Sequence, residues 1–162
     1  MKIQDYTEEL INLRRHFHQY PELALQEVET SAYIRIYLEK LGYTVTAVEP
    51  TGLIAELPCL KKREKLIILR AEMDALPIQE QTGLPYASVN QGCMHACGHD
   101  MILAAALILA KIVAEEQETF PVRMRFLFEP AEEIGEGAKR MIQAGALKDP
   151  RPDAFLMFHY AA

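Results

Sequence analysis

Two short segments, Met-His-Ala-Cys-Gly-His-Asp and Glu-Pro-Ala-Glu-Glu, contain side chains that are suited to binding a metal ion. Cys97 and His99 supply a thiolate and an imidazole, and Glu132 and Glu133 supply adjacent carboxylates. These are the ligand types that a borderline-soft divalent metal prefers. One of two neighbouring glutamates can bind metal while the other transfers protons. The residues therefore indicate metal-assisted hydrolysis.

Further residues are candidates for the same site. Gly98 lies between Cys97 and His99 and allows the backbone to turn so that both side chains face one point. His159 is a further candidate ligand, and Asp74 is expected either to orient a ligand or to join it. Cys93 is interpreted as a small buried residue, with pairing to Cys97 or metal binding as alternatives.

Three other histidines are interpreted differently. His16 and His18 lie in a predicted helix with no carboxylate or thiolate beside them in the sequence, so we expect both to be structural. His95 is a candidate for supporting a metal ligand through a hydrogen bond, but the sequence does not assign it.

The elements that must position these residues follow from the apolar pattern. Residues 5–8 resemble a capping box that begins a helix, and Leu10, Leu13 and Phe17 then fall on one helical face. The pattern predicts further helices at 28–41, 100–115 and 137–143, and strands at 43–48, 53–57, 66–69, 122–128 and 154–158. The last strand is expected to be buried, like the apolar run at 66–69.

From residue 66 onward, strands and helices alternate, which favours an α/β fold with parallel strands and right-handed crossovers. Asp74 follows the first of these strands, the two glutamates at 132 and 133 follow the second, and His159 follows the third. Ligands of open α/β sheets bind at the carboxyl ends of the strands. The candidate residues are therefore expected to meet at one edge of the sheet.

Length and composition indicate one ordinary globular domain: 162 residues, 50% hydrophobic and 25% charged, with a net charge of −6. The basic run at 61–65 is interpreted as a solvated turn, so we expect no nucleic-acid partner. The longest apolar stretch, 101–110, is about half of what a membrane span needs, and no signal peptide is predicted. An odd number of cysteines, three, fits a reducing compartment, so a cytoplasmic protein is expected.

The sequence resembles the aminoacylase/carboxypeptidase metallopeptidases, in particular the amidohydrolase branch. That branch contains hippurate hydrolases, N-acyl-amino-acid amidohydrolases, plant auxin-conjugate hydrolases and N-acetyldiaminopimelate deacetylases. The resemblance rests on motifs that occur in order along the chain: Arg-Arg-His-Phe-His at 14–18 with Pro-Glu-Leu at 21–23, Arg-Ala-Glu-Met-Asp-Ala-Leu-Pro-Ile at 70–78, the two segments described above with Gly-Ala at 137–138, and Phe-His at 158–159.

The resemblance implies a site with two divalent metal ions, which can be zinc, manganese, cobalt or nickel. Cys97 is then the bridging ligand, and the further ligands are His99, Glu133 and His159. Glu132 is the implied general base and acid. Asp74, by the same resemblance, matches an orienting aspartate, and the implied substrate is an N-acyl amino acid of the hippurate or N-acetyl-amino-acid type.

The resemblance also implies a three-layer, zinc-exopeptidase-like sandwich with a mostly parallel mixed sheet. Residues 1–162 are expected to be the first part of the catalytic domain, without the lid or dimerisation domain and the C-terminal catalytic segment. Expected partners are a second copy or a complementary C-terminal half.

Two positions depart from the branch, which has aspartate in place of Glu72 and histidine in place of Ile102. A catalytically silent metal-binding remnant is the alternative function. A redox or structural-metal module that uses Cys93 and Cys97 is disfavoured by the order of the motifs.

Overall fold

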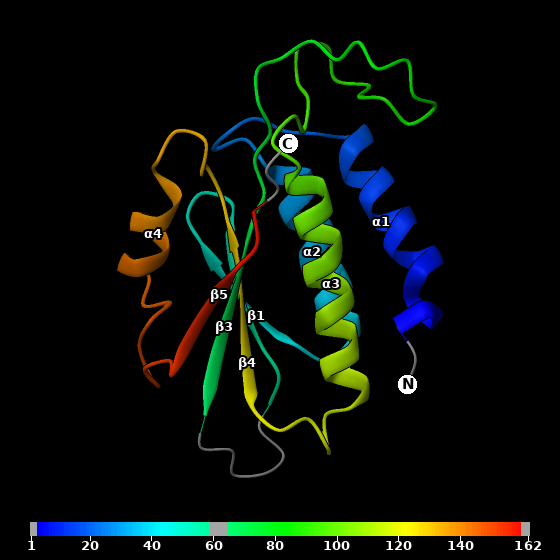
Figure 1. Ribbon diagram of the computed structural model, residues 1–162. Helices are drawn as coiled ribbons and strands as arrows, with labels where there is room; N and C mark the ends of the chain where they lie inside the picture. Colours follow the sequence, from blue (N-terminus) through cyan, green and yellow to red (C-terminus); the bar gives the residue numbers. More distant parts are fainter. Residues whose placement is uncertain (1–2, 59–64, 160–162) are drawn as a thin grey trace.

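The protein, seen here in a computed structural model, is described over residues 3–58 and 65–159. The five strands in these residues form a central sheet, with α1, α2 and α3 on one side and α4 on the other (Figure 1). The α/β three-layer architecture predicted from the sequence is thus confirmed. The basic run predicted as a solvated turn lies outside the described residues, except for Lys65.

The helices agree closely with the predicted ranges. They are the short 3-10 helix η1 (Ile3–Tyr6) and the α-helices α1 (Thr7–Gln19), α2 (Val28–Lys40), α3 (His99–Glu115) and α4 (Gly137–Gln143). The capping box predicted at residues 5–8 is wrong, because the residue that caps α1 is Tyr6 and its side chain makes no capping hydrogen bond. The physical reason is that η1 runs directly into α1, so Asp5 already lies inside a helical turn.

The sheet is mixed. Its strands are β1 (Thr44–Val48), β2 (Gly52–Glu56), β3 (Leu66–Glu72), β4 (Arg123–Glu129) and β5 (Ala154–Met157), in the spatial order β1-β2-β4-β3-β5. β3 pairs in parallel with both β4 and β5, whereas β2 is antiparallel to β1 and β4. Four of the five strands therefore run in one direction, as the sequence predicted.

Successive side chains of the central strands face the two helical layers in turn. On β4, Phe126 and Phe128 join the large core beneath α1, α2 and α3. Leu127, between them, packs with Ile68 and Met141 in a smaller core on the α4 side. This period of two is the geometry of a strand that is buried on both faces.

α3 is the most apolar of the helices, and it covers the sheet. Leu103 and Leu107 on this helix are fully buried. Gly98 caps the start of α3 with a φ of 81°, a left-handed conformation that glycine adopts without steric cost. Within residues 3–58 and 65–159, no helix is both long and apolar enough to cross a membrane.

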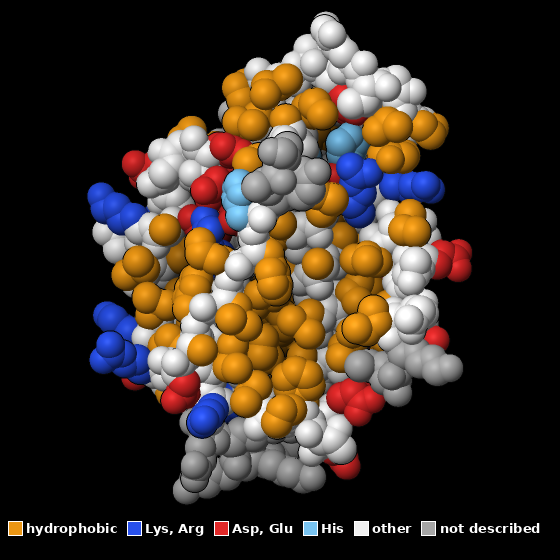
Figure 2. Space-filling view, in the orientation of Figure 1, with side chains coloured by type: hydrophobic (Ala, Val, Ile, Leu, Met, Phe, Trp, Pro, Cys, Tyr) orange, Lys and Arg blue, Asp and Glu red, His pale blue; other side chains and the backbone are white. Residues whose placement is uncertain are grey.

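The last strand, β5, differs from its predicted environment. It was expected to be buried, but Phe155, Leu156 and Met157 are 45%, 44% and 56% exposed. The reason is its position, since β5 is an edge strand that pairs only with β3 in the described part of the chain. Apolar side chains gather on this face of the protein (Figure 2).

Candidate metal centre

The carboxyl ends of β3 and β4 and the start of α3 bring four predicted residues together. Nε2 of His99 lies 3.8 Å from Oε2 of Glu132 and 3.8 Å from Oε1 of Glu133. On its other side, the ring hydrogen-bonds through Nδ1 to the backbone carbonyl of Asp74, at 2.8 Å. This bond fixes the orientation of the ring and leaves Nε2 facing the two glutamates, as in metal sites whose histidines are held by a second hydrogen bond.

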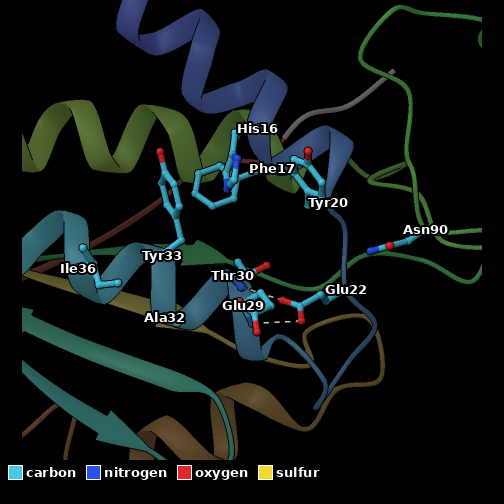
Figure 3. Close-up of a pocket in the computed structure, with 10 residues that line it drawn as sticks. All are labelled: His16, Phe17, Tyr20, Glu22, Glu29, Thr30, Ala32, Tyr33, Ile36 and Asn90. Carbon is cyan, nitrogen blue, oxygen red and sulfur yellow. Dashed lines mark hydrogen bonds between the residues drawn. The ribbon is translucent and has the colours of Figure 1, made fainter.

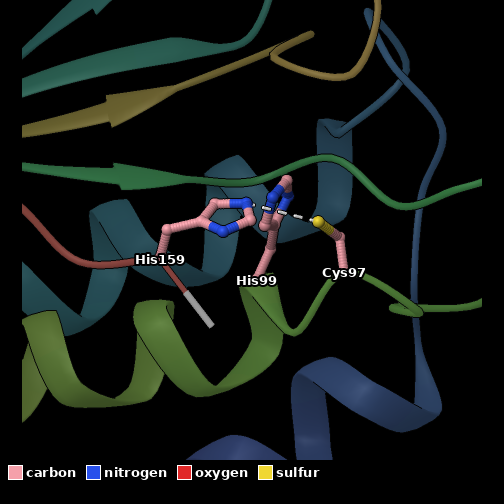
Figure 4. A group of neighbouring side chains, drawn as sticks. All are labelled: Cys97, His99 and His159. Carbon is pink, nitrogen blue, oxygen red and sulfur yellow. Dashed lines mark hydrogen bonds between the residues drawn. The ribbon is translucent and has the colours of Figure 1, made fainter. Parts of the chain in front are cut away.

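A second group of donors lies beside the first. Cys97, at the turn before α3, and His159, just after β5, point toward His99 (Figure 4). Sγ of Cys97 is 3.4 Å from Nε2 of His159. One donor atom from each of these three residues lies within 4.8 Å of the others, and the same holds for His99 with the two glutamates.

The unpaired polar atoms at this point fit a cation. Nε2 of His99 and Oε1 of Glu133 are buried and have no hydrogen-bond partner among the described residues. Buried polar atoms are nearly always paired, and a divalent metal satisfies an imidazole and a carboxylate together. His99 belongs to both donor groups, whereas Cys97, which the resemblance implies as the bridging ligand, belongs to one. The bridging role of Cys97 stays a prediction.

The electrostatics of Cys97 depend on its acidic surroundings. Burial, a hydrogen bond to Glu133 and the negative charges of Glu133 and Glu132 raise the pKa of the Cys97 thiol to about 11. A cation bound among these groups would offset the negative charges and favour the thiolate.

Asp74 holds the segment that carries the two glutamates. Its fully buried carboxylate accepts the backbone N–H of Glu132 through Oδ1, at 3.0 Å, and that of Glu133 through Oδ2, at 2.9 Å. One residue therefore orients His99 through its carbonyl and both glutamates through its side chain.

Arg70 connects several carboxylates beside the site, and sequence reasoning did not identify it. Its guanidinium donates to Glu72 at 2.7 Å and to Glu129, and its Nη2 lies 3.8 Å from Oε1 of Glu132. Burial raises the pKa of Glu72, although Arg70 opposes this effect. Charged residues in the otherwise apolar strand β3 were the sequence signal that could have pointed to this cluster.

A cavity lies beside this cluster. A cavity of about 450 Å³ is lined by Arg70, Glu129 and Glu132 together with apolar side chains from β4, α4 and β5. Glu132 thus faces this cavity.

The structure places the remaining histidines and Cys93 outside the donor groups. His18 lies between two carboxylates, 2.8 Å from Oδ2 of Asp100 and 3.1 Å from Oε1 of Glu80, which the local sequence did not reveal. His95 is buried with neither ring nitrogen hydrogen-bonded among the described residues, and burial and the proximity of His99 lower its pKa to about 3. Cys93 is a free thiol whose Sγ lies 3.4 Å from the carbonyl of Pro21.

His16 packs in a different part of the molecule. Its ring stacks on Tyr33 at a centroid distance of 4.1 Å, beside a cavity of about 440 Å³ (Figure 3). Glu22, which also lines this cavity, accepts the backbone N–H groups of Glu29 and Thr30 at the start of α2. None of the candidate metal ligands lines this cavity.

The fold and the donor groups define an α/β protein with a candidate metal centre at the carboxyl edge of a mixed sheet. Residues 68–162 match Peptidase family M20/M25/M40. The chain is 47% identical over 149 residues to an N-acetyl-L-cysteine deacetylase of Bacillus subtilis, covering 91% of this chain and 35% of that protein. It is 41% identical over 158 residues to an N-acetyldiaminopimelate deacetylase of Limosilactobacillus fermentum, covering 94% and 41%.

A solved structure agrees with these relatives. A Bacillus subtilis protein described as a dinuclear metal-binding peptidase of the M20 family superposes with a TM-score of 0.89 at 40% identity, covering 99% of this chain and 44% of that one. This chain therefore belongs to Peptidase family M20/M25/M40, a family of hydrolases. It spans 35–41% of the length of the two deacetylases.

Proposed function

We propose that this chain is the part of a metal-dependent amidohydrolase that carries most of its metal ligands, and that the complete enzyme cleaves the amide bond of N-acyl amino acids. One observation carries the proposal: Nε2 of His99 and Oε1 of Glu133 are buried, unpartnered among the described residues and 3.8 Å apart. The names of the two deacetylase relatives support the substrate class.

In this proposal, Cys97, His99, Glu133 and His159 hold two divalent ions, which are zinc, manganese, cobalt or nickel. When bound, such ions supply positive charge that polarises the acyl carbonyl and lowers the pKa of water. Asp74 keeps His99 and both glutamates in place through its three hydrogen bonds.

Glu132 is proposed to transfer the protons. Its carboxylate lines the cavity, and its Oε1 lies 3.8 Å from Nη2 of Arg70. An ionised Glu132 can take a proton from the attacking water and then deliver it to the nitrogen of the departing amine. That transfer yields a carboxylate and a free amino acid.

We propose a cytoplasmic location for the protein, which is consistent with the free thiols of Cys93 and Cys97. Residues 1–162 are proposed as the first part of its catalytic domain. A complementary C-terminal half or a second copy is the proposed partner.

The test has two stages. Titration of the chain with Zn²⁺ and Co²⁺ should show binding that Cys97→Ser weakens strongly, with loss of the cobalt–thiolate absorption. The chain is then combined with a polypeptide that matches the remaining length of the relatives and assayed on N-acetyl and N-benzoyl amino acids. Hydrolysis should need both pieces, with at most trace activity from the chain alone. A combined protein that binds metal but cleaves none of these amides contradicts the proposed activity.

A further inference from the structure

Glu27, which lies 104 residues before the segment that carries the glutamate pair, is buried beside that segment. Its Oε1 accepts the backbone N–H of Ala131 at 2.8 Å, and its Oε2 accepts the hydroxyl of Thr51 at 2.6 Å. The Glu27 side chain is fully buried, and Thr51 is nearly so. Both carboxylate oxygens are therefore paired inside the protein.

Ala131 has an unusual backbone conformation. Its φ is 55°, in the left-handed region that residues other than glycine rarely adopt, and its side chain is fully buried. Its carbonyl accepts the N–H groups of Glu136 and Gly137, at 3.1 and 3.2 Å. A conformation of this kind persists only where the surroundings over-determine it, and the bond from the Ala131 N–H to Glu27 is part of those surroundings.

Glu27 is itself held at the start of a helix. Glu27 directly precedes α2, and its own carbonyl accepts the N–H of Ser31 in the first turn of that helix. Three consecutive N–H groups, those of Ala131, Glu132 and Glu133, thus donate to two buried carboxylates, first Glu27 and then Asp74.

We infer that Glu27 is a positioning residue that, through Ala131, holds the turn carrying Glu132 and Glu133 so that both carboxylates face His99. The inference rests on the proposed function, because it concerns the residues that are proposed to bind metal and transfer protons. Glu27 itself touches neither metal ligand nor substrate in this role. The length of its side chain, rather than its charge, is what the geometry requires.

Two conservative variants separate length from charge. Glu27→Gln keeps the reach and an acceptor oxygen for the Ala131 N–H but removes the charge, whereas Glu27→Asp keeps the charge and is one methylene too short. Thr51→Val is the matched control, because it removes the other hydrogen bond to Glu27 and leaves the bond to Ala131 intact.

The first readout needs no metal. Amide hydrogen exchange of residues 129–137 should rise about 5-fold in Glu27→Asp, the effect of losing one hydrogen bond, and should stay within about 2-fold of wild type in Glu27→Gln and Thr51→Val. The second readout is the dissociation constant for Co²⁺, which should rise by about 10- to 100-fold in Glu27→Asp alone, as for other residues that support a ligand.

The opposite order, with Glu27→Asp like wild type and Glu27→Gln impaired, overturns the inference. So does a rise in exchange that is uniform across the sheet, or a local rise in exchange with unchanged Co²⁺ affinity. If the wild-type chain binds no Co²⁺, the proposed metal function fails, while hydrogen exchange still decides whether Glu27 holds the turn.

Discussion

Nε2 of His99 lies 3.8 Å from Oε1 of Glu133, and both atoms are buried without a hydrogen-bond partner among the described residues. His99 lies at the start of α3, and Glu133 lies in the turn after β4. An imidazole and a carboxylate left in this state destabilise the protein, and a shared cation removes the penalty.

Glu133→Gln is expected to weaken binding of Zn²⁺ or Co²⁺ to the chain by at least about 10- to 100-fold, the range found when only the support of a ligand is lost. Glu132→Gln, the matched control of equal size, should keep the metal affinity. In the complete enzyme, Glu132→Gln should lower turnover by roughly two to four orders of magnitude. Isothermal titration and an amide-hydrolysis assay measure the two effects. Equal loss of metal in both variants contradicts the proposed division of roles.

The exposed edge strand β5 predicts association of the 162-residue chain. Phe155, Leu156 and Met157 are exposed apolar side chains on a strand whose outer edge pairs with no other strand among the described residues, and such an edge is a template for pairing with another strand. Leu156→Lys should weaken self-association by about 10-fold or more, measured by sedimentation equilibrium over a range of concentrations. Val28→Lys, at an exposed apolar side chain on α2, is the control and should have little effect. A wild-type chain that stays monomeric at high concentration rules out this role for β5.

The buried carboxyl of Glu27 should make the stability of the folded protein depend on pH. Burial raises the pKa of its carboxyl, although the hydrogen bonds from Thr51 and Ala131 oppose the effect. Between the ordinary value and the raised one, the folded protein holds more protons than the unfolded chain, so stability falls as pH rises through this window. The stability that the protonated carboxyl contributes should be fully present below the ordinary pKa of 4.5 and lost above the raised pKa.

Urea unfolding of wild type and Glu27→Gln at a series of pH values isolates this contribution, because the variant cannot titrate at that position. The difference between the two free energies of unfolding should change in the weakly acidic range. A difference that is constant from acid to neutral pH would show that Glu27 does not titrate with a raised pKa.

Replacing Gly137 with alanine should strongly destabilise the protein. A methyl group at this position would meet the carbonyl oxygen of Pro130 at 1.8 Å and Cγ of Glu129 at 2.6 Å. Because the first contact is with backbone, Gly137→Ala should lower the free energy of unfolding by about 1–3 kcal/mol or more, as other overpacked sites do.

Gly145→Ala is the control for Gly137→Ala. That position has a φ of 88° but open space around it, so only the cost of the left-handed conformation, about 1–2 kcal/mol, applies. Chemical denaturation of both variants measures the difference. A Gly137→Ala protein as stable as Gly145→Ala would show that the turn after β4 relaxes easily.

Local patterns predicted much of the fold and of the candidate site. The alternation of strands and helices from Leu66 placed Asp74, Glu132 and His159 after successive strands. Because parallel strands present their carboxyl ends at one edge, their convergence followed from order along the chain. The donor types of Cys97 and His99 and the spacing around Gly98 required no tertiary information either.

Other features depend on contacts between distant segments, which no local pattern encodes. The prediction that β5 is buried was wrong, because an apolar strand has the same sequence pattern inside a sheet and at its edge. Only the order of the strands in the sheet places β5 at the edge. Arg70 meets Glu129 because β3 and β4 pair in a register that places Glu72 beside Glu129. Glu27 reaches Ala131 across 104 residues. The sequence alone thus determined which donors are present and at which edge they gather, whereas the hydrogen bonds that orient them arise only when packing brings remote backbone and side chains within reach.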